Sequence, residues 1–313
     1  MSGPEFVVAV DLGGSLTKIA AASSEGRLSP VERLKTRRDG GGEALLEWLA
    51  EQILRVAHAG PGRCQGYGVV VPGIIEASSG TVRAAPNVGW YDVPVAARLS
   101  ALTGLPGAVG HDVRSGGLAE WRLGAWAGVA NLLFLPLGTG IAGALVVDGK
   151  MLEADGYAGE IGHIHVHAAG QLPCACGQRG CLETVASAAG VARSYGRLAG
   201  TSGSSAPDAQ QVADRARAGD PAARAAYGLV AEALSEALLL YVTLLAPEVV
   251  VIGGGLVGAI DLFVPETEAE LRSRATIQRL PRIVPATLGA DAGIVGAGLI
   301  GRASVARRRD TYG

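Results

Sequence analysis

Three of the chain's four cysteines lie within one eight-residue stretch, and histidines precede them. The stretch belongs to GHIHVHAAGQLPCACGQRGCLE at 162–183, and its thiols are those of Cys174, Cys176 and Cys181. Thiols at such close spacing favour either a metal ion or a redox pair. The histidines stand at 163, 165 and 167, on one face of an extended segment, so spacing alone does not choose among them.

The redox alternative is a disulfide, which would leave one thiol of the cluster unpaired. The sequence MSGPEFVVAV shows no charged region followed by an apolar region, as an export signal would. We therefore expect reduced cysteines and a metal site. Cys64 stands alone between Arg63 and Gln65, and we expect it to be structural.

Glycine-rich turns follow three apolar, strand-like runs. FVVAV at 6–10 leads to DLGGSLTK, NLLFLPL at 131–137 leads to Gly-Thr-Gly, and VVVI at 249–252 leads to three glycines. Glycine lets backbone N–H groups approach a phosphate without a Cβ between them. One such turn more often merely closes a hairpin, but three in one chain favour nucleotide binding. None fits the P-loop or the Rossmann spacing.

These turns supply the candidate nucleotide-binding residues. They are Asp11, Gly13, Gly14, Ser15, Thr17, Lys18, Gly138, Thr139, Gly140, Gly253, Gly254 and Gly255. The Asp11 carboxylate is suited to a metal ion or its water, and the Thr139 hydroxyl can donate to a phosphate oxygen.

The elements around these turns predict an α/β protein of two similar lobes. The pattern of apolar strand, glycine turn and second apolar strand occurs at 6–22 and again at 131–150. Such a repeat is typical of a duplicated architecture. Leu45, Leu49, Ile53 and Val56 recur at helical spacing and predict a helix over 43–57.

Composition narrows the class of protein. The chain has 313 residues, 47 of them glycine, a net charge of −2 and a pI of about 6.2, so no basic footprint for nucleic acid is present. Two long apolar stretches begin at Val129 and Ala237, but Pro and Gly residues break the first and Pro247-Glu248 interrupts the second. We expect both to be buried core rather than membrane spans, and a cytoplasmic protein.

Four motifs together resemble those of the ROK family of sugar kinases and related repressors. They are Asp-Leu-Gly-Gly-Ser-Leu-Thr-Lys at 11–18, Leu-Gly-Thr-Gly-Ile at 137–141, Gly-Tyr-Ala-Gly-Glu-Ile-Gly-His at 156–163 and Cys-Ala-Cys-Gly-Gln-Arg-Gly-Cys-Leu-Glu at 174–183. The resemblance implies two RNase-H-like lobes of the actin-like ATPase fold with ATP, Mg²⁺ and substrate in the cleft. We expect an N-terminal lobe at 1–112, a C-terminal lobe at 113–295, and a helix at 296–308 that packs back on the first lobe.

The same resemblance implies roles for individual residues. It selects His163 as the fourth ligand of a closed, structural zinc site with Cys174, Cys176 and Cys181, inside a knuckle at 163–183. Asp112 is the implied general base; its alternative role is the N-cap of the helix that follows. The implied sugar-binding residues are Gly73, His111, Asp112, Glu160, His163 and Glu183.

One position departs from the family pattern. Hexokinases of the family generally have Asn-Asp where this chain has His111-Asp112. A neutral amide offers donors and an acceptor, whereas imidazole is bulkier and changes charge near neutral pH. We therefore expect an ATP-dependent kinase that transfers the γ-phosphate to a hydroxyl of a hexose or sugar-like polyol, and His111 adds the alternative of a substrate other than glucose, such as an N-acetylhexosamine or a cyclitol.

Two other functions remain as alternatives. A sugar-responsive repressor of the family would need a helix-turn-helix arm before the first glycine loop, and that loop begins at Asp11. A non-catalytic sugar sensor would keep the fold, but the presence of Asp112 and all three glycine loops favours the kinase. Similar kinases also lead us to expect a homodimer.

Overall fold

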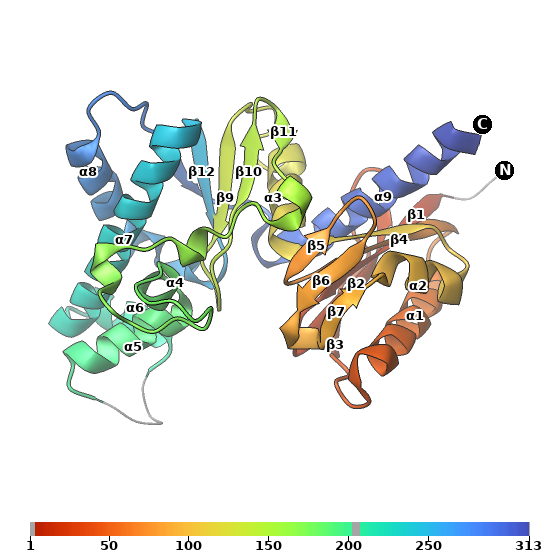
Figure 1. Cartoon of the computed structure of the whole chain (residues 1–313), viewed down its shortest axis with the longest axis horizontal. Coiled ribbons are helices and arrows are strands. Elements are labelled where there is room, and N and C mark those ends of the chain that lie inside the picture. The colour runs from red at the N-terminus through yellow and green to blue at the C-terminus, as the bar shows by residue number, and fades with distance from the viewer. Residues whose placement is uncertain (1–3, 202–206, 313) are drawn as a thin grey trace. The chain divides into compact units, whose positions relative to one another are not determined.

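The computed structural model describes residues 4–201 and 207–312 (Figure 1). By contact the chain divides into two units. The first comprises the described parts of 1–120, 153–158 and 291–313, and the second those of 121–152 and 159–290. This division differs from the expected boundary after residue 112, because helix α3 (Asp112–Leu123) stays with the first unit as far as Glu120 and a short later segment joins it.

The first unit is built on a five-stranded sheet in the order β3-β2-β1-β4-β8. Its strands are β1 (Glu5–Leu12), β2 (Leu16–Ser23), β3 (Glu32–Lys35), β4 (Arg63–Val71) and β8 (Gly107–His111). A three-stranded sheet of β5 (Ile74–Glu76), β6 (Thr81–Ala85) and β7 (Trp90–Val93) follows β4, with the 3₁₀ turn η1 (Pro86–Val88) between its last two strands.

Helices cover both faces of the first sheet because its strands are apolar on both sides. Phe6, Val8 and Val10 pack with α1 (Gly41–Ala59) and α2 (Val95–Thr103), while Val7 and Ala9 face α9 (Ala292–Tyr312). The expected helix over 43–57 is α1, with all four of its spaced apolar residues buried. The C-terminal helix begins earlier than expected and packs on β1, β4 and β8.

Two glycines explain how closely α9 approaches the sheet. A Cβ at Gly68 on β4 would lie 1.9 Å from the carbonyl oxygen of Ala297, and one at Gly301 would lie 2.7 Å from the nitrogen of Gly68. Backbone contact at such distances excludes any side chain at either position.

The second unit repeats the first topology with the strand order β11-β10-β9-β12-β13. These strands are β9 (Leu132–Pro136), β10 (Ala144–Val147), β11 (Lys150–Met151), β12 (Val249–Gly253) and β13 (Arg282–Pro285). In both sheets a central strand pairs antiparallel with the next strand and parallel with a later one. The duplicated hairpin expected from the sequence is therefore confirmed, as is the actin-like α/β fold class.

Helices of the second unit pack into one apolar core over this sheet. They are α4 (Glu183–Ala186), α5 (Ala188–Leu198), α6 (Ala209–Arg217), α7 (Pro221–Leu245) and α8 (Val264–Arg274), with the 3₁₀ turns η3 (Ile161–His163), η4 (His167–Ala169) and η5 (Gly255–Leu262). Among the described helices, α7 alone is long and apolar enough to cross a membrane. Its buried side chains, including Tyr227, Val230, Leu234 and Leu238, contribute to this core, which accounts for its apolar character.

Candidate functional site

The first glycine loop closes the hairpin between β1 and β2. The backbone N–H of Gly13 donates to the carbonyl oxygen of Leu16 at 3.0 Å, and a Cβ at Gly13 would lie 2.7 Å from that oxygen. Ser15 is exposed at the turn. Thr17 is buried, and its hydroxyl lies 2.8 Å from the hydroxyl of Thr36, which donates to the carbonyl oxygen of Gly13. Thr17 thus supports the loop through Thr36, and its contact with a nucleotide stays a prediction.

Asp11 and Lys18 face each other across this hairpin. The register pairs them, and the Lys18 ammonium lies 3.4 Å from Asp11 Oδ2 and 3.8 Å from Asp291 Oδ1. Burial raises the pKa of Asp11; Lys18 opposes the rise, and the carboxylates of Asp112 and Asp291 add to it. A partly buried carboxylate near two others is a favourable place for a divalent cation.

Asp112 is the first residue of α3, directly after strand β8. Its Oδ1 accepts a hydrogen bond from the N–H of Val113 at 2.7 Å. Burial raises the pKa of Asp112, while the hydrogen bond from Val113 and the charge of Arg114 lower it. A carboxylate whose proton affinity is raised is suited to accept a proton from a hydroxyl.

His111 provides the helix cap that sequence reasoning considered for Asp112. Its Nδ1 accepts a hydrogen bond from the N–H of Arg114 at 3.3 Å, and the ring is 7% exposed. Nδ1 also lies 3.5 Å from Asp112 Oδ1. At the start of α3, His111 thus binds the N–H of Arg114, while Asp112 binds the N–H of Val113.

Gly73 follows β4 with a φ of +123°. A Cβ there would lie 2.2 Å from the carbonyl oxygen of Ala84, so only glycine fits. Close packing against the backbone of β6 therefore explains the glycine, and the contact of Gly73 with a sugar stays a prediction.

The second glycine loop is bound to Glu183. The loop follows β9, and Thr139 and Gly140 are exposed. Glu183 Oε2 accepts the N–H of Ile141 at 2.8 Å, and a Cβ at Gly140 would lie 2.8 Å from the same oxygen. A cavity of about 430 Å³ is lined in part by Thr139, Glu183 and Arg193. The structure thus brings an expected phosphate-binding residue and an expected sugar-binding residue to one cavity.

The third glycine loop rests on the second. The N–H of Leu137 donates to the carbonyl oxygen of Gly253, and the N–H of Leu256 donates to the carbonyl oxygen of Leu137. Gly254 has a φ of +77°, and a Cβ there would lie 2.5 Å from Leu137 O. Nothing lies within 4 Å of a Cβ built on Gly255, so backbone there is open to a ligand.

The cysteine cluster assembles as a four-ligand group. One donor atom from each of His163, Cys174, Cys176 and Cys181 lies within 4.8 Å of all the others. His163 Nδ1 is 3.6 Å from Cys174 Sγ, and the sulfurs of Cys176 and Cys181 are 3.7 Å apart. A disulfide needs about 2.05 Å, whereas sulfurs around a tetrahedral zinc ion lie about 3.8 Å apart. All four cysteines are described, and all are free thiols.

The thiols of the cluster differ in their affinity for protons. Burial, followed by the neighbouring Cys174 and Cys176 thiols, raises the pKa of Cys181 to about 12. Hydrogen bonds from the Gln178 backbone and other neighbours lower the pKa of Cys176. Metal coordination is what ionises a buried thiol that is neutral on its own.

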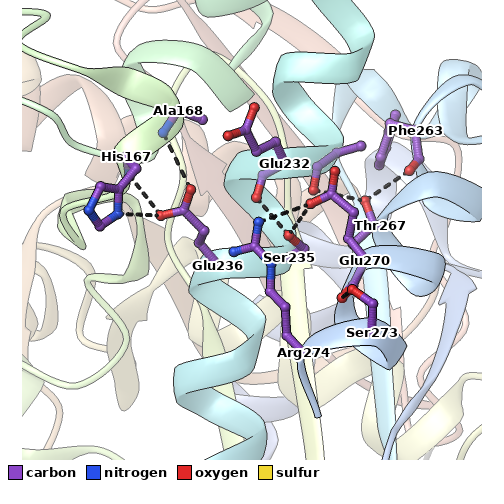
Figure 2. Close-up of polar contacts among 11 residues, drawn as sticks. His167, Ala168, Glu232, Ser235, Glu236, Phe263, Thr267, Glu270, Ser273 and Arg274 are labelled. Atoms are coloured by element: carbon purple, nitrogen blue, oxygen red, sulfur yellow. Dashed lines mark hydrogen bonds and ion pairs between the residues drawn. The ribbon is translucent and has the colours of Figure 1, made fainter.

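The other two histidines lie outside this group. His165 forms an isolated bridge with Cys181 and packs against Gly180. The His167 side chain is exposed, and its Nδ1 lies 3.3 Å from Oε2 of Glu236 on α7. Glu236 also accepts the N–H groups of His167 and Ala168, and so joins this part of the knuckle to α7 (Figure 2).

Glu160 is an expected sugar-binding residue that lies directly before η3. It is exposed, and its carbonyl oxygen accepts the N–H of His163 at the start of η3. In the structure it belongs to the second unit, as do His163 and Glu183, while Gly73, His111 and Asp112 belong to the first.

Three residues that sequence reasoning missed hold the expected ones in place. They are Thr36 beneath the first loop, Asp291 beside Lys18, and Arg114 after Asp112. Arg114 and Asp291 carry charge next to a predicted site, and that proximity appears only after folding. Thr36 gave no signal in the sequence.

Comparison with known proteins agrees with this geometry. The family model described as "ROK family" matches residues 7–303. The glucokinase of Halalkalibacterium halodurans is 35% identical and covers 94% of each chain, and the N-acetylgalactosamine kinase AgaK of a Shewanella species is 33% identical over 93% of this chain and 95% of its own. The crystal structure of a ROK family glucokinase from Streptomyces griseus, in complex with glucose and AMPPNP, has a TM-score of 0.80 and 26% identity, and covers 95% of this chain and 99% of its own. The duplicated sheets, the three glycine loops and the His-Cys cluster thus belong together, and the chain is a member of the ROK family.

Proposed function

We propose that this ATP-dependent sugar kinase transfers the γ-phosphate to a hydroxyl of a hexose or sugar-like polyol, with Asp112 as the general base. One observation carries the assignment of the base. Asp112 directly follows β8 with a carboxyl group whose pKa is raised by burial, and the N–H of Arg114 is bound by His111 rather than by Asp112. Its carboxylate would accept the proton of the attacking hydroxyl as the bond to phosphorus forms and ADP leaves.

The nucleotide is proposed to bind to the three glycine loops. Backbone N–H groups at Gly14, Gly140 and Gly255, with the Thr139 hydroxyl and the Lys18 ammonium, offer donors to phosphate oxygens. Mg²⁺ would be held by Asp11, whose partly buried carboxylate is influenced by the charges of Asp112 and Asp291. When bound, Mg²⁺ neutralises phosphate charge during the transfer.

The sugar is proposed to contact Glu160, His163 and Glu183, as the family resemblance implies. Carboxylates suit a polyhydroxylated ligand because each can accept from two neighbouring hydroxyls. Zinc at the His-Cys cluster would hold the segment that presents His163 and Glu183. The distances among the four donors support zinc, and its function there would be structural.

The substrate is proposed to differ from glucose because of His111. Nδ1 accepts the N–H of Arg114, so the neutral ring carries its proton on Nε2. An asparagine side chain offers both a donor and an acceptor at the corresponding place. One of the relatives is an N-acetylgalactosamine kinase, which supports the proposal that the substrate is an N-acetylhexosamine.

A coupled ADP-release assay with MgATP tests this function. The acceptor panel comprises glucose, other hexoses, N-acetylhexosamines and cyclitols, and every compound is also tested for a shift in the unfolding midpoint. Release that depends on one acceptor class supports the kinase and names the class. A compound that raises the midpoint without being phosphorylated would favour a sugar sensor instead.

A further inference from the structure

Arg114 is a buried cation next to the proposed catalytic base. Its side chain is 7% exposed, and it lies on the first turn of α3, two residues after Asp112. Arginine is rarely buried to this extent unless its guanidinium is held by hydrogen bonds. Nη1 donates to the carbonyl oxygens of Gly156 at 3.0 Å and of Ala158 at 3.1 Å.

The two carbonyl groups belong to a segment with unusual backbone geometry. Residues 153–158 join the first unit between two parts of the second. Ala154 and Asp155 have φ values of 44° and 52°, and Gly156 has 97°. Left-handed conformations at non-glycine residues are strained and persist only where the surroundings enforce them. A Cβ at Gly156 would lie 2.3 Å from the carbonyl oxygen of Ile75, so the segment also packs tightly on β5.

Both the backbone and the side chain of Arg114 therefore make hydrogen bonds. Its backbone N–H donates to His111 Nδ1, while its side chain holds the carbonyl groups of Gly156 and Ala158. The helix turn that carries Asp112 is in this way joined to a strained segment more than forty positions away in the chain.

We propose that Arg114 is a positioning residue for phosphoryl transfer, which fixes the first turn of α3, and with it Asp112, against the segment 153–158. The proposal rests on the proposed function, because it takes Asp112 as the general base. Arg114 itself touches neither reacting group in this assignment.

The charge of Arg114 gives the proposal a second, separable consequence. The charged groups facing Asp112 are the His111 ring on β8, Asp11 on β1 and Arg114 on its own helix. Of these, Arg114 opposes the effect of burial on the Asp112 carboxyl and favours its ionised form. Loss of the positive charge would therefore raise the pKa of Asp112 further.

Two substitutions separate geometry from charge. Arg114→Lys keeps the charge but not the planar fork that reaches two carbonyl groups, and Arg114→Met removes both. Arg55→Met is the matched control, because Arg55 is also held by hydrogen bonds, two to Glu32 and one to Gln52, but is exposed on α1. The kcat/KM of each variant is measured from pH 5 to 9 with MgATP and the acceptors glucose and N-acetylgalactosamine.

We expect kcat/KM to fall by about 10-fold or more in both Arg114 variants and to stay unchanged in Arg55→Met. The acidic limb of the pH profile should move to higher pH in Arg114→Met but stay in place in Arg114→Lys. Amide hydrogen exchange over 153–160 should rise in both, with or without acceptor turnover.

Three results would overturn the proposal. If Arg114→Met has the amide hydrogen exchange and the kinetics of the wild type, the Arg114 contacts do not restrain the site. A loss of activity that merely follows the unfolded fraction, with an unmoved acidic limb, would reduce Arg114 to a stability role. If Asp112→Asn keeps the turnover of the wild type, Asp112 is not the base, and both the proposed function and this inference are overturned. If Asp112→Asn is inactive but the Arg114 variants behave as the wild type does, the inference alone is overturned.

Discussion

At the scale of the residue, His111 and Asp112 both bind backbone N–H groups at the start of α3. The imidazole accepts the N–H of Arg114 at the start of α3, and the carboxylate beside it keeps a raised pKa. Asparagine is a favoured helix cap, so a change at 111 can alter ligand contacts without exposing the helix end.

His111→Asn should therefore shift selectivity and leave stability nearly unchanged. We expect the ratio of kcat/KM for glucose to that for N-acetylgalactosamine to rise by about 10-fold, since an amide restores both donor and acceptor. The unfolding midpoint should stay within about 2 °C of wild type. Steady-state kinetics on both sugars checks the first value and thermal unfolding the second; an unchanged ratio would show that residue 111 does not determine selectivity.

Asp112→Asn should stabilise the folded protein at neutral pH. Because burial raises the pKa of Asp112 in the folded state, ionising it there costs more than in the unfolded chain. This penalty is present above the folded-state pKa and disappears as pH falls through that value toward the ordinary 3.8. We expect a midpoint about 2 °C higher at pH 7.5 and a smaller gain at pH 4. A lower unfolding midpoint of Asp112→Asn than of the wild type at pH 7.5 would contradict the predicted stabilisation.

At the scale of the element, Glu183 connects the second glycine loop to the start of α4. Its Oε2 accepts the N–H of Ile141, and it shares a cavity with Thr139. A proposed sugar ligand thus also supports a proposed phosphate-binding loop.

Glu183→Ala should weaken nucleotide binding as well as sugar binding. Loss of the acceptor leaves the Ile141 N–H without its partner, which costs about 1–3 kcal/mol, or about 5- to 150-fold in affinity. Glu160→Ala is the comparison, because the exposed Glu160 has no hydrogen bond to that loop among the contacts described. Calorimetric titration with a non-hydrolysable ATP analogue distinguishes the two; equal nucleotide affinities in the two variants would refute the link.

The elements also show how far the sequence predicted this site. Local patterns were sufficient for the glycine loops and the repeated hairpins, because each depends on a strand and the residues that directly follow it. The Arg114 contacts and the burial of Thr17 against Thr36 join residues that are far apart in the chain, and no local pattern signals them. The unit boundary at 120 was missed for a similar reason, since helix packing rather than composition decides it.

At the scale of the whole molecule, each unit has its own apolar core. One core surrounds α1 and the first sheet, and another surrounds α7 and the second sheet. The His-Cys cluster lies in the second unit, while Cys64 lies partly buried in the first. Units with separate cores can unfold as separate transitions.

A zinc chelator should therefore destabilise the second unit selectively. We expect one calorimetric transition to move to lower temperature by several degrees, because bound metal contributes to folding stability. The temperature at which Cys64 becomes reactive to a thiol reagent should stay the same when the cluster cysteines are replaced by serine. If the calorimetric transition and the temperature at which Cys64 becomes reactive shift by the same amount, the two units unfold as one.

The most direct measurement of the central claim compares wild type with Asp112→Asn, using MgATP and the best acceptor of the panel. Asp148→Asn serves as control, since Asp148 is exposed in the turn before Lys150 with a φ that asparagine also adopts. We expect acceptor-dependent ADP release to fall by about 10²- to 10⁴-fold in Asp112→Asn, with acceptor affinity within about threefold of wild type and a fully active Asp148→Asn. Turnover in Asp112→Asn close to that of wild type would contradict the assignment of Asp112 as the base.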